Sequence, residues 1–146
     1  MLLKKYVELN TALLLAIEYH KNQIDKAGLP YILHPLYVMN KVKSIDAKIV
    51  AVLHDILEDT DLTAELLLQK GISSENVKRI QLLTHSSNLS YFNYIRKIKE
   101  SNDSITIEVK EQDLLHNSDL TRLKYISEKD YNRHLKYLNA LKILHS

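Results

Sequence analysis

The chain has 146 residues and a net charge of +2, from 20 basic and 18 acidic residues, and 45% of its residues are hydrophobic. This length suits one globular domain, residues 1–146, and is too short for two ordinary ones. The composition excludes disulfides and thiolate metal sites because there is no cysteine, and the evenly spread charge argues against nucleic acid as a partner.

Helices should dominate, because 2 glycines and 2 prolines are too few for the tight turns of a sheet of short strands. Apolar residues spaced by three and four, together with capping residues, predict where these helices lie. In chain order the expected helices are 3–26, 35–43, 46–58, 61 or 63 to 71, 73 or 74 to 83, 91–102, 103–117 and 129–144.

The segment SITIEV, residues 104–109, gives an ambiguous local signal. Its β-branched, alternating residues would by themselves indicate a strand. A lone strand would have no partner in this sequence, so a helix over 103–117 is favoured. The expected fold class is therefore all-α, a compact helical bundle.

The stretch AVLHDILEDT, residues 51–60, places four ionisable side chains inside an apolar run. On a continuous helix at about 100° per residue, His54, Asp55, Glu58 and Asp59 would share one side and hydrophobic residues the other. Unpaired carboxylates are costly to bury, so this side should face water, cations or a metal ion. From this stretch alone, a solvated acidic helix end is the more common explanation.

Two further stretches favour a metal site. GLPYILHP, residues 28–35, places His34 directly before a proline that can begin a helix, and imidazole is a common metal ligand. EQDLLHNSD, residues 111–119, places Asp113 and Asn117 four residues apart, on one helical face. A carboxylate there could complete a set of two histidines and two carboxylates.

Taken in order, these motifs resemble those of the HD-domain phosphohydrolases, and specifically the hydrolase half of the RelA/SpoT family and its free-standing small alarmone hydrolases. The matching pieces are HKNQ, GLPYILHP, AVLHDILEDT and VKEQDLLHN, and they extend over most of the chain. The resemblance implies an HD-domain helical bundle that removes the 3′-pyrophosphate of (p)ppGpp-like nucleotides, with GDP or GTP and pyrophosphate as products.

The resemblance also implies roles for individual residues. Glu58 and Asp59 would be catalytic. The implied metal ligands, for Mn²⁺ or another divalent cation, are His34, His54, Asp55 and Asp113. The implied substrate-binding residues are Lys26, Tyr31, Lys110 and Asn117.

The preferred base is left open, because Asp25, Asp119 and Leu120 stand where the family commonly has other residues. Guanine and adenine alarmones, a different nucleotide, and a non-catalytic nucleotide-binding regulatory module are the alternatives. His20 is expected to be structural or to support the ligands, and His116 to pack or to support them. His85, His134 and His145 are expected at the surface. A cytoplasmic protein without a membrane partner is expected, since no secretory signal is indicated, and the oligomeric state, including a homo-oligomer, is left open.

Overall fold

The computed structural model describes all residues, 1–146, and every long element in it is a helix. The elements are α1 (Leu2–His20), α2 (Leu33–Lys41), α3 (Ile45–Leu53), α4 (Ile56–Asp59), α5 (Ala64–Gln69), α6 (Ser74–Leu83), α7 (Tyr91–Glu100), α8 (Ser104–Asn117), the 3-10 turn η1 (Leu120–Arg122) and α9 (Glu128–His145). The all-α fold class expected from the sequence is confirmed.

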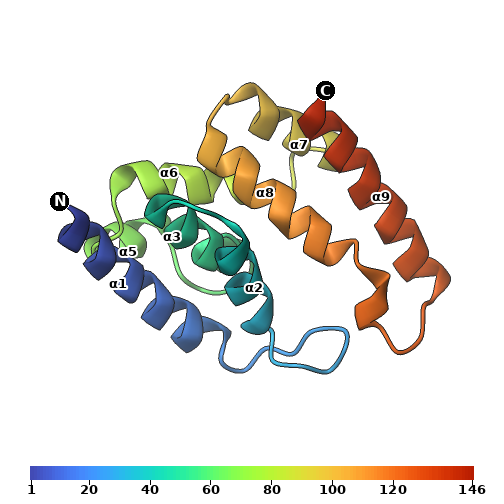
Figure 1. The fold of residues 1–146 in the computed structure, drawn as a ribbon, viewed down its shortest axis with the longest axis horizontal. Coiled ribbons are helices and arrows are strands. Elements are labelled where there is room, and N and C mark those ends of the chain that lie inside the picture. The colour runs from blue at the N-terminus through green and yellow to red at the C-terminus, as the bar shows by residue number, and fades with distance from the viewer.

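Helix α3 lies at the centre of the bundle (Figure 1). It packs against α1, α2, α6 and α8, while α7 and α9 cover the other side of α8. Every residue of α3 from Ile49 to Leu53 is buried, as expected for a helix that is apolar on all sides. This central position brings the C-terminal end of α3 close to both α2 and α8.

The helix predicted over 46–58 is not continuous, and this part of the prediction was wrong. Helix α3 ends at Leu53, His54 and Asp55 form a turn, and α4 starts at Ile56. Ser44 caps α3 through its side chain, so the helix begins at Ile45, one residue before the predicted start. Because of this break, His54 and Asp55 lie in the turn while Glu58 and Asp59 lie in α4. The four side chains therefore do not share one face of a continuous helix.

The first predicted helix was also too long, since α1 ends at His20 and residues 21–32 form a loop. Asp25 organises this loop: its Oδ1 accepts hydrogen bonds from the backbone N–H groups of Ala27 and Leu29, both at 2.9 Å. Gly28 adopts a φ of +82°, which favours glycine. A side chain that bonds its own loop competes with helix continuation, which explains the early end.

The ambiguous segment 104–109 is helical, as predicted. Asp103 caps α8 by accepting from the N–H of Thr106, and Thr106 and Val109 are buried three residues apart. The cap and the packing against neighbouring helices override the local β propensity. No helix in the structure has the length and apolar character needed to cross a membrane.

Candidate metal centre and active site

Four side chains from three separate parts of the fold converge on one point. His34 lies in the first turn of α2, His54 and Asp55 form the turn between α3 and α4, and Asp113 lies in α8. One ligand atom from each residue lies within 4.8 Å of all the others. The Nε2 atoms of His34 and His54 lie 2.9 Å and 3.3 Å from Oδ1 of Asp113, so the imidazoles and carboxylates point at the same centre.

The turn between α3 and α4 orients His54. Its Nδ1 lies 2.6 Å from the backbone oxygen of Ala51, which can only accept, so Nδ1 carries the hydrogen. In the neutral ring, Nε2 then carries a lone pair that faces Asp55 and Asp113. This nitrogen is buried and has no hydrogen-bond partner. A histidine that donates one nitrogen to a carbonyl and leaves the other free is the usual arrangement of a metal ligand.

His34 is oriented by a second histidine. Its Nδ1 lies 2.7 Å from Nδ1 of His116, whose ring lies between those of His34 and Tyr37. Burial, followed by the charges of Arg122 and His34, lowers the pKa of His116 to about 4. Neutral His116 can therefore accept a hydrogen from His34, which leaves Nε2 of His34 available to the centre.

Buried Lys110 balances the charge of the cluster. Its Nζ lies 2.9 Å from Oδ2 of Asp113, one turn away on α8. Burial opposes ionisation of Asp113, but Lys110 and His54 outweigh it and hold its pKa well below the usual range. Asp113 is therefore a carboxylate, with Oδ2 on the lysine and Oδ1 toward the histidines.

The pKa of His54 is raised. Burial opposes its charged form, but the carboxylates of Asp55 and Asp113 outweigh burial. The same coupling lowers the pKa of Asp55 to about 2, where His54 outweighs the effect of burial. In the absence of a metal ion the cluster holds a proton, and a divalent cation would replace it. Two neutral imidazoles and two carboxylates form a suitable donor set for a first-row divalent ion.

Two acids lie next to the cluster in α4. Glu58 accepts a hydrogen bond from the backbone N–H of His85 at 2.7 Å, which fixes the position of its carboxylate. Partial burial, followed by the charges of Asp55 and Glu58, raises the pKa of Asp59 to about 6. The Tyr31 hydroxyl donates to Asp55, and burial raises the pKa of this phenol, so it remains a donor.

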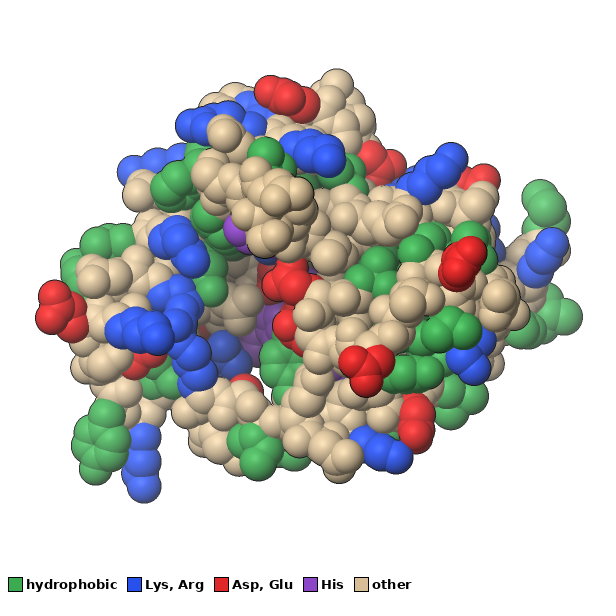
Figure 2. Space-filling view, turned by 180° about the vertical axis from the view of Figure 1, so that it is seen from behind, with side chains coloured by type: hydrophobic (Ala, Val, Ile, Leu, Met, Phe, Trp, Pro, Cys, Tyr) green, Lys and Arg blue, Asp and Glu red, His purple; other side chains and the backbone are tan.

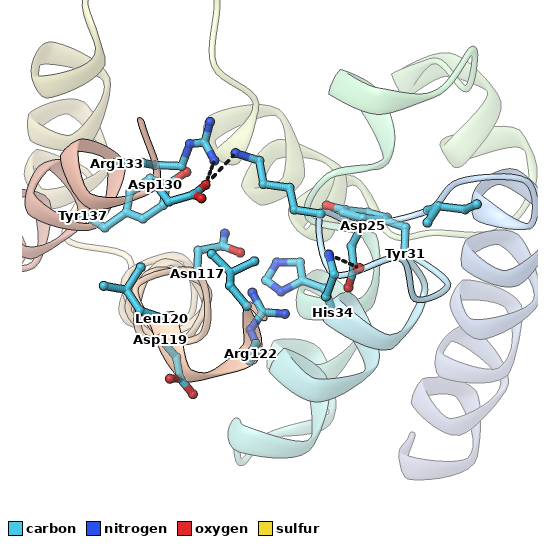
Figure 3. A pocket seen from close by; sticks show the side chains of 14 residues that line it. Asp25, Tyr31, His34, Asn117, Asp119, Leu120, Arg122, Asp130, Arg133 and Tyr137 are labelled. Carbon is cyan, nitrogen blue, oxygen red and sulfur yellow. Dashed lines mark hydrogen bonds and ion pairs between the residues drawn. The ribbon is translucent and has the colours of Figure 1, made fainter. Parts of the chain in front are cut away.

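Two cavities open beside the cluster. A polar cavity of about 290 Å³ is lined by the two acids of α4, Lys110 and Lys136. A second, of about 320 Å³, lies against His34 between the loop 21–32, η1 and the start of α9 (Figure 3). Both include Tyr31, Asn117 and Tyr137, so they meet at the end of α8. Figure 2 shows acidic and histidine side chains inside a hollow bordered by Lys and Arg.

The structure places the residues singled out from the sequence around these cavities. Asn117 donates from Nδ2 to Oδ1 of Asp113 at 2.9 Å, which holds it at the junction of the two cavities. Lys26 lines the larger cavity, with its Nζ 3.8 Å from Asp130. Lys110 lies in the polar cavity but is buried and paired with Asp113.

Sequence reasoning missed several residues of the site. His85, expected at the surface, is half-buried and stacks on Tyr94 at 4.7 Å between ring centroids. Lys136 and Tyr137 of α9 line the polar cavity, and Arg122 and Arg133 line the larger one. These residues belong to no motif, and only the packing of α9 and η1 against the site brings them there.

Two of the residues that depart from the family pattern have structural partners. Asp25 uses Oδ1 to bind the loop backbone, as described above. Asp119 caps η1, with Oδ1 accepting from the N–H and hydroxyl of Thr121 at 2.9 Å and 2.6 Å. Both nevertheless line the larger cavity together with Leu120, so they contribute to its chemistry.

The sequence of the chain is similar to those of bacterial enzymes that share one name. The chain is 32% identical over 137 residues to a guanosine-3′,5′-bis(diphosphate) 3′-pyrophosphohydrolase from Borreliella burgdorferi, a match that covers 84% of this chain and 20% of that protein. An enzyme of the same name from Aquifex aeolicus is 42% identical over 67 residues, covering 43% of this chain and 10% of that one. The chain thus spans a fifth or less of the length of these relatives.

A solved structure has a similar fold. It belongs to a metazoan ortholog of SpoT, described as hydrolysing ppGpp and playing a role in starvation responses. It superposes with a TM-score of 0.77 and 19% identity, covering 95% of this chain and 86% of that one. No protein-family model matches the chain. The relationship read from the motifs is therefore confirmed by sequence similarity, and the helical bundle by structure.

Proposed function

We propose that this relative of the guanosine-3′,5′-bis(diphosphate) 3′-pyrophosphohydrolases is itself a metal-dependent hydrolase that removes the 3′-pyrophosphate of an alarmone nucleotide. One observation carries the proposal: two imidazoles and two carboxylates converge on a point beside two further acids. Sequence similarity to enzymes of that activity supports it. In the reaction, water adds to the phosphorus that carries the 3′-oxygen, and the bond between that phosphorus and the 3′-oxygen breaks. The 3′-oxygen takes up a proton, and the products are a nucleotide with a free 3′-hydroxyl and pyrophosphate.

His34, His54, Asp55 and Asp113 would hold the divalent cation, with Mn²⁺ as the ion expected from the family resemblance. Such an ion supplies positive charge next to the phosphates and lowers the pKa of water. His116 and Ala51 keep the two imidazoles in the tautomers that leave their Nε2 atoms free. Lys110 keeps Asp113 ionised.

Asp59 and Glu58 would handle the proton of the attacking water. A carboxyl with a pKa of about 6 accepts a proton more readily than an ordinary aspartate, and it returns the proton near neutral pH. Glu58 is held in the wall of the polar cavity by the N–H of His85, where it can orient water. We assign Asp59 as the general base and Glu58 as the residue that orients the attacking water.

The two cavities would bind different parts of the substrate. The polar cavity, with Lys110 and Lys136, would receive the pyrophosphate, because its cations offset the charge of the neighbouring acids. The larger cavity, with Tyr31, Asn117 and Arg122, would receive the nucleoside, since it combines aromatic, amide and guanidinium groups. Lys26 borders the same cavity and would meet the 5′-phosphates.

A hydrolase acting on a different nucleotide is the second candidate. The observation that favours it is the lining of the larger cavity by Asp25, Asp119 and Leu120, since a carboxylate cannot stack on a base as a guanidinium does. The base therefore has to be determined by experiment.

The test is incubation of Mn²⁺-loaded protein with guanosine and adenosine 3′-pyrophosphates, nucleoside triphosphates and nucleoside monophosphates, followed by identification of the released group. Pyrophosphate released from a 3′-substituted nucleotide supports the proposal, and phosphate released from the others supports the second candidate. Binding without turnover under every metal tested would contradict both and indicate a regulatory module. Asp55→Ala is the inactive control.

A further inference from the structure

Helix α1 has two apolar faces, and only one of them is covered. Ala12, Leu15 and Ala16 are buried against the rest of the bundle, mainly against α3. On the opposite side, Leu3, Val7, Leu14 and Ile17 are 74%, 57%, 69% and 51% exposed. An amphipathic helix at the surface of a monomer buries one apolar stripe, and a second, exposed stripe is typical of a surface that binds a further partner.

The exposed residues form one continuous stripe, which we call the α1 stripe: Leu3, Val7, Asn10, Leu14 and Ile17. At about 100° per residue these five positions fall within an arc of about 80°. Figure 1 places α1 along one edge of the molecule, with α3 on its inner side, so a second helix can approach from outside. Hydrophobic side chains reach the surface near this edge in Figure 2.

The α1 stripe is complementary to itself when a second copy runs antiparallel to it. A twofold axis near Asn10 places Leu3 level with Ile17 of the second helix and Val7 within about one residue rise, 1.5 Å, of Leu14. Each apolar residue then meets an apolar residue, and Asn10 meets its own copy, with which an amide can exchange hydrogen bonds. This is the requirement of an isologous interface, in which one patch pairs with itself.

The charged residues beside the α1 stripe fit the same twofold arrangement. Lys4 and Glu18 lie on the same flank of the α1 stripe, one near each end, and both are exposed. In the antiparallel arrangement, Lys4 of one copy comes level with Glu18 of the other to within about two residue rises, or about 3 Å, which these long side chains can span. Within its own chain Glu18 meets only Lys21, 3.0 Å away at the surface, a contact that is easily exchanged.

We propose that the protein forms a homodimer through the α1 stripe, with the two α1 helices antiparallel about an axis near Asn10. Two apolar pairs on each side of the axis, a central polar pair and two ion pairs define the register. A parallel arrangement is disfavoured because Lys4 of one copy would lie about 14 residue rises, or about 21 Å, along the axis from Glu18 of the other, so neither ion pair could form. The cavities of the active site open elsewhere, and none of the residues that line them belongs to the α1 stripe.

The test is the molar mass in solution, measured by light scattering and sedimentation from low to high micromolar concentration. The wild-type protein should approach twice its 17.0 kDa as concentration rises. Leu14→Glu should remain at the monomer mass, because it places a carboxylate opposite Val7. Ile126→Glu, at a residue 55% exposed in the loop before α9, is the matched control and should dimerise as the wild type does.

A charge exchange tests the register. Lys4→Glu and Glu18→Lys should each weaken the dimer, and the double variant should restore it. Monomeric wild-type protein at every concentration, or a Leu14→Glu variant that still dimerises, would overturn the proposal. A double variant weaker than both single ones would overturn the antiparallel register. Circular dichroism verifies that each variant is folded, and because mass is the readout, the result does not depend on the proposed hydrolase activity.

Discussion

Gln23 donates a hydrogen bond from Nε2 to the backbone oxygen of Asp59, 2.8 Å away, although the two residues are 36 positions apart. Its Oε1 lies 2.7 Å from Nδ1 of buried His20, and its backbone oxygen accepts from the N–H of Tyr31 at 2.9 Å. One residue thus connects three parts of the fold: its side chain contacts the end of α1 and the end of α4, and its backbone contacts the loop that carries Tyr31. The amide orientation follows, because the carbonyl of Asp59 can only accept.

From this connection we predict that Gln23→Ala lowers kcat about tenfold to a hundredfold with little change in KM, because α4 and its acids lose their fixed position. Mn²⁺ affinity, measured by calorimetry, should stay close to that of the wild type, since no ligand is moved directly. The exposed neighbour provides the control: Asn22→Ala should leave both quantities unchanged. A Gln23→Ala variant with wild-type kcat would show that the connection does not position the acids.

Metal binding should release protons and weaken as the pH falls. The pKa of His54 is raised because the carboxylates of Asp55 and Asp113 outweigh its burial, so a cation has to displace the proton. Calorimetry of Mn²⁺ binding in two buffers of different ionisation enthalpy measures the protons released. A proton count of zero near neutral pH would contradict the assigned ligand.

Mutation should distinguish the role of a metal ligand from the role of the neighbouring acid. Asp55→Ala removes a ligand and should abolish both tight Mn²⁺ binding and turnover, whereas Asp59→Ala should keep metal binding and lose at least about a hundredfold in kcat. Equilibrium dialysis and turnover measured on the same preparations give both quantities. Loss of metal from the Asp59→Ala protein would argue that this acid is a ligand.

Removing Asp113 should destabilise the metal-free protein more than removing Lys110. Asp113→Ala leaves the buried charge of Lys110 unpaired, at a cost of about 3 to 5 kcal/mol in the free energy of unfolding. Lys110→Met leaves Asp113 with His34 and His54 as remaining partners, so its cost should be smaller. Urea denaturation measures both, and the double variant should be more stable than Asp113→Ala alone.

A polar network away from the site should make stability depend on acid pH. Partial burial opposes the ionised form of Asp46, but hydrogen bonds from Lys5 and Asn76 outweigh it and lower its pKa. The folded-state pKa therefore lies below the unfolded value of about 3.9, so the contribution is complete above that value and is lost as the pH falls through the folded pKa. The stability difference between wild type and Asp46→Asn should be largest at neutral pH and shrink below about pH 4. A difference that is constant from pH 3 to 7 would contradict this origin.

The sequence by itself determined most of the helices and the residues of the cluster. Helix caps and apolar spacing act over a few residues, so the predicted helix starts include residues 63 and 73, where Thr63 and Ser73 cap α5 and α6. The helix predicted over 103–117 is observed from Ser104 to Asn117. The motif order indicated His34, His54, Asp55 and Asp113 as one set. Their roles as ligands stay predictions, as do those of Glu58 and Asp59.

Tertiary structure decided what those residues can do. The turn at His54 and Asp55, the contact of His34 with His116, and the Gln23 connection to Asp59 join segments that are distant in sequence or depend on a broken helix. No local pattern encodes them, because they arise from the packing of α1, α2 and α8 around the central helix α3. Local chemistry sets which groups are available, and long-range packing sets the distances and charges between them.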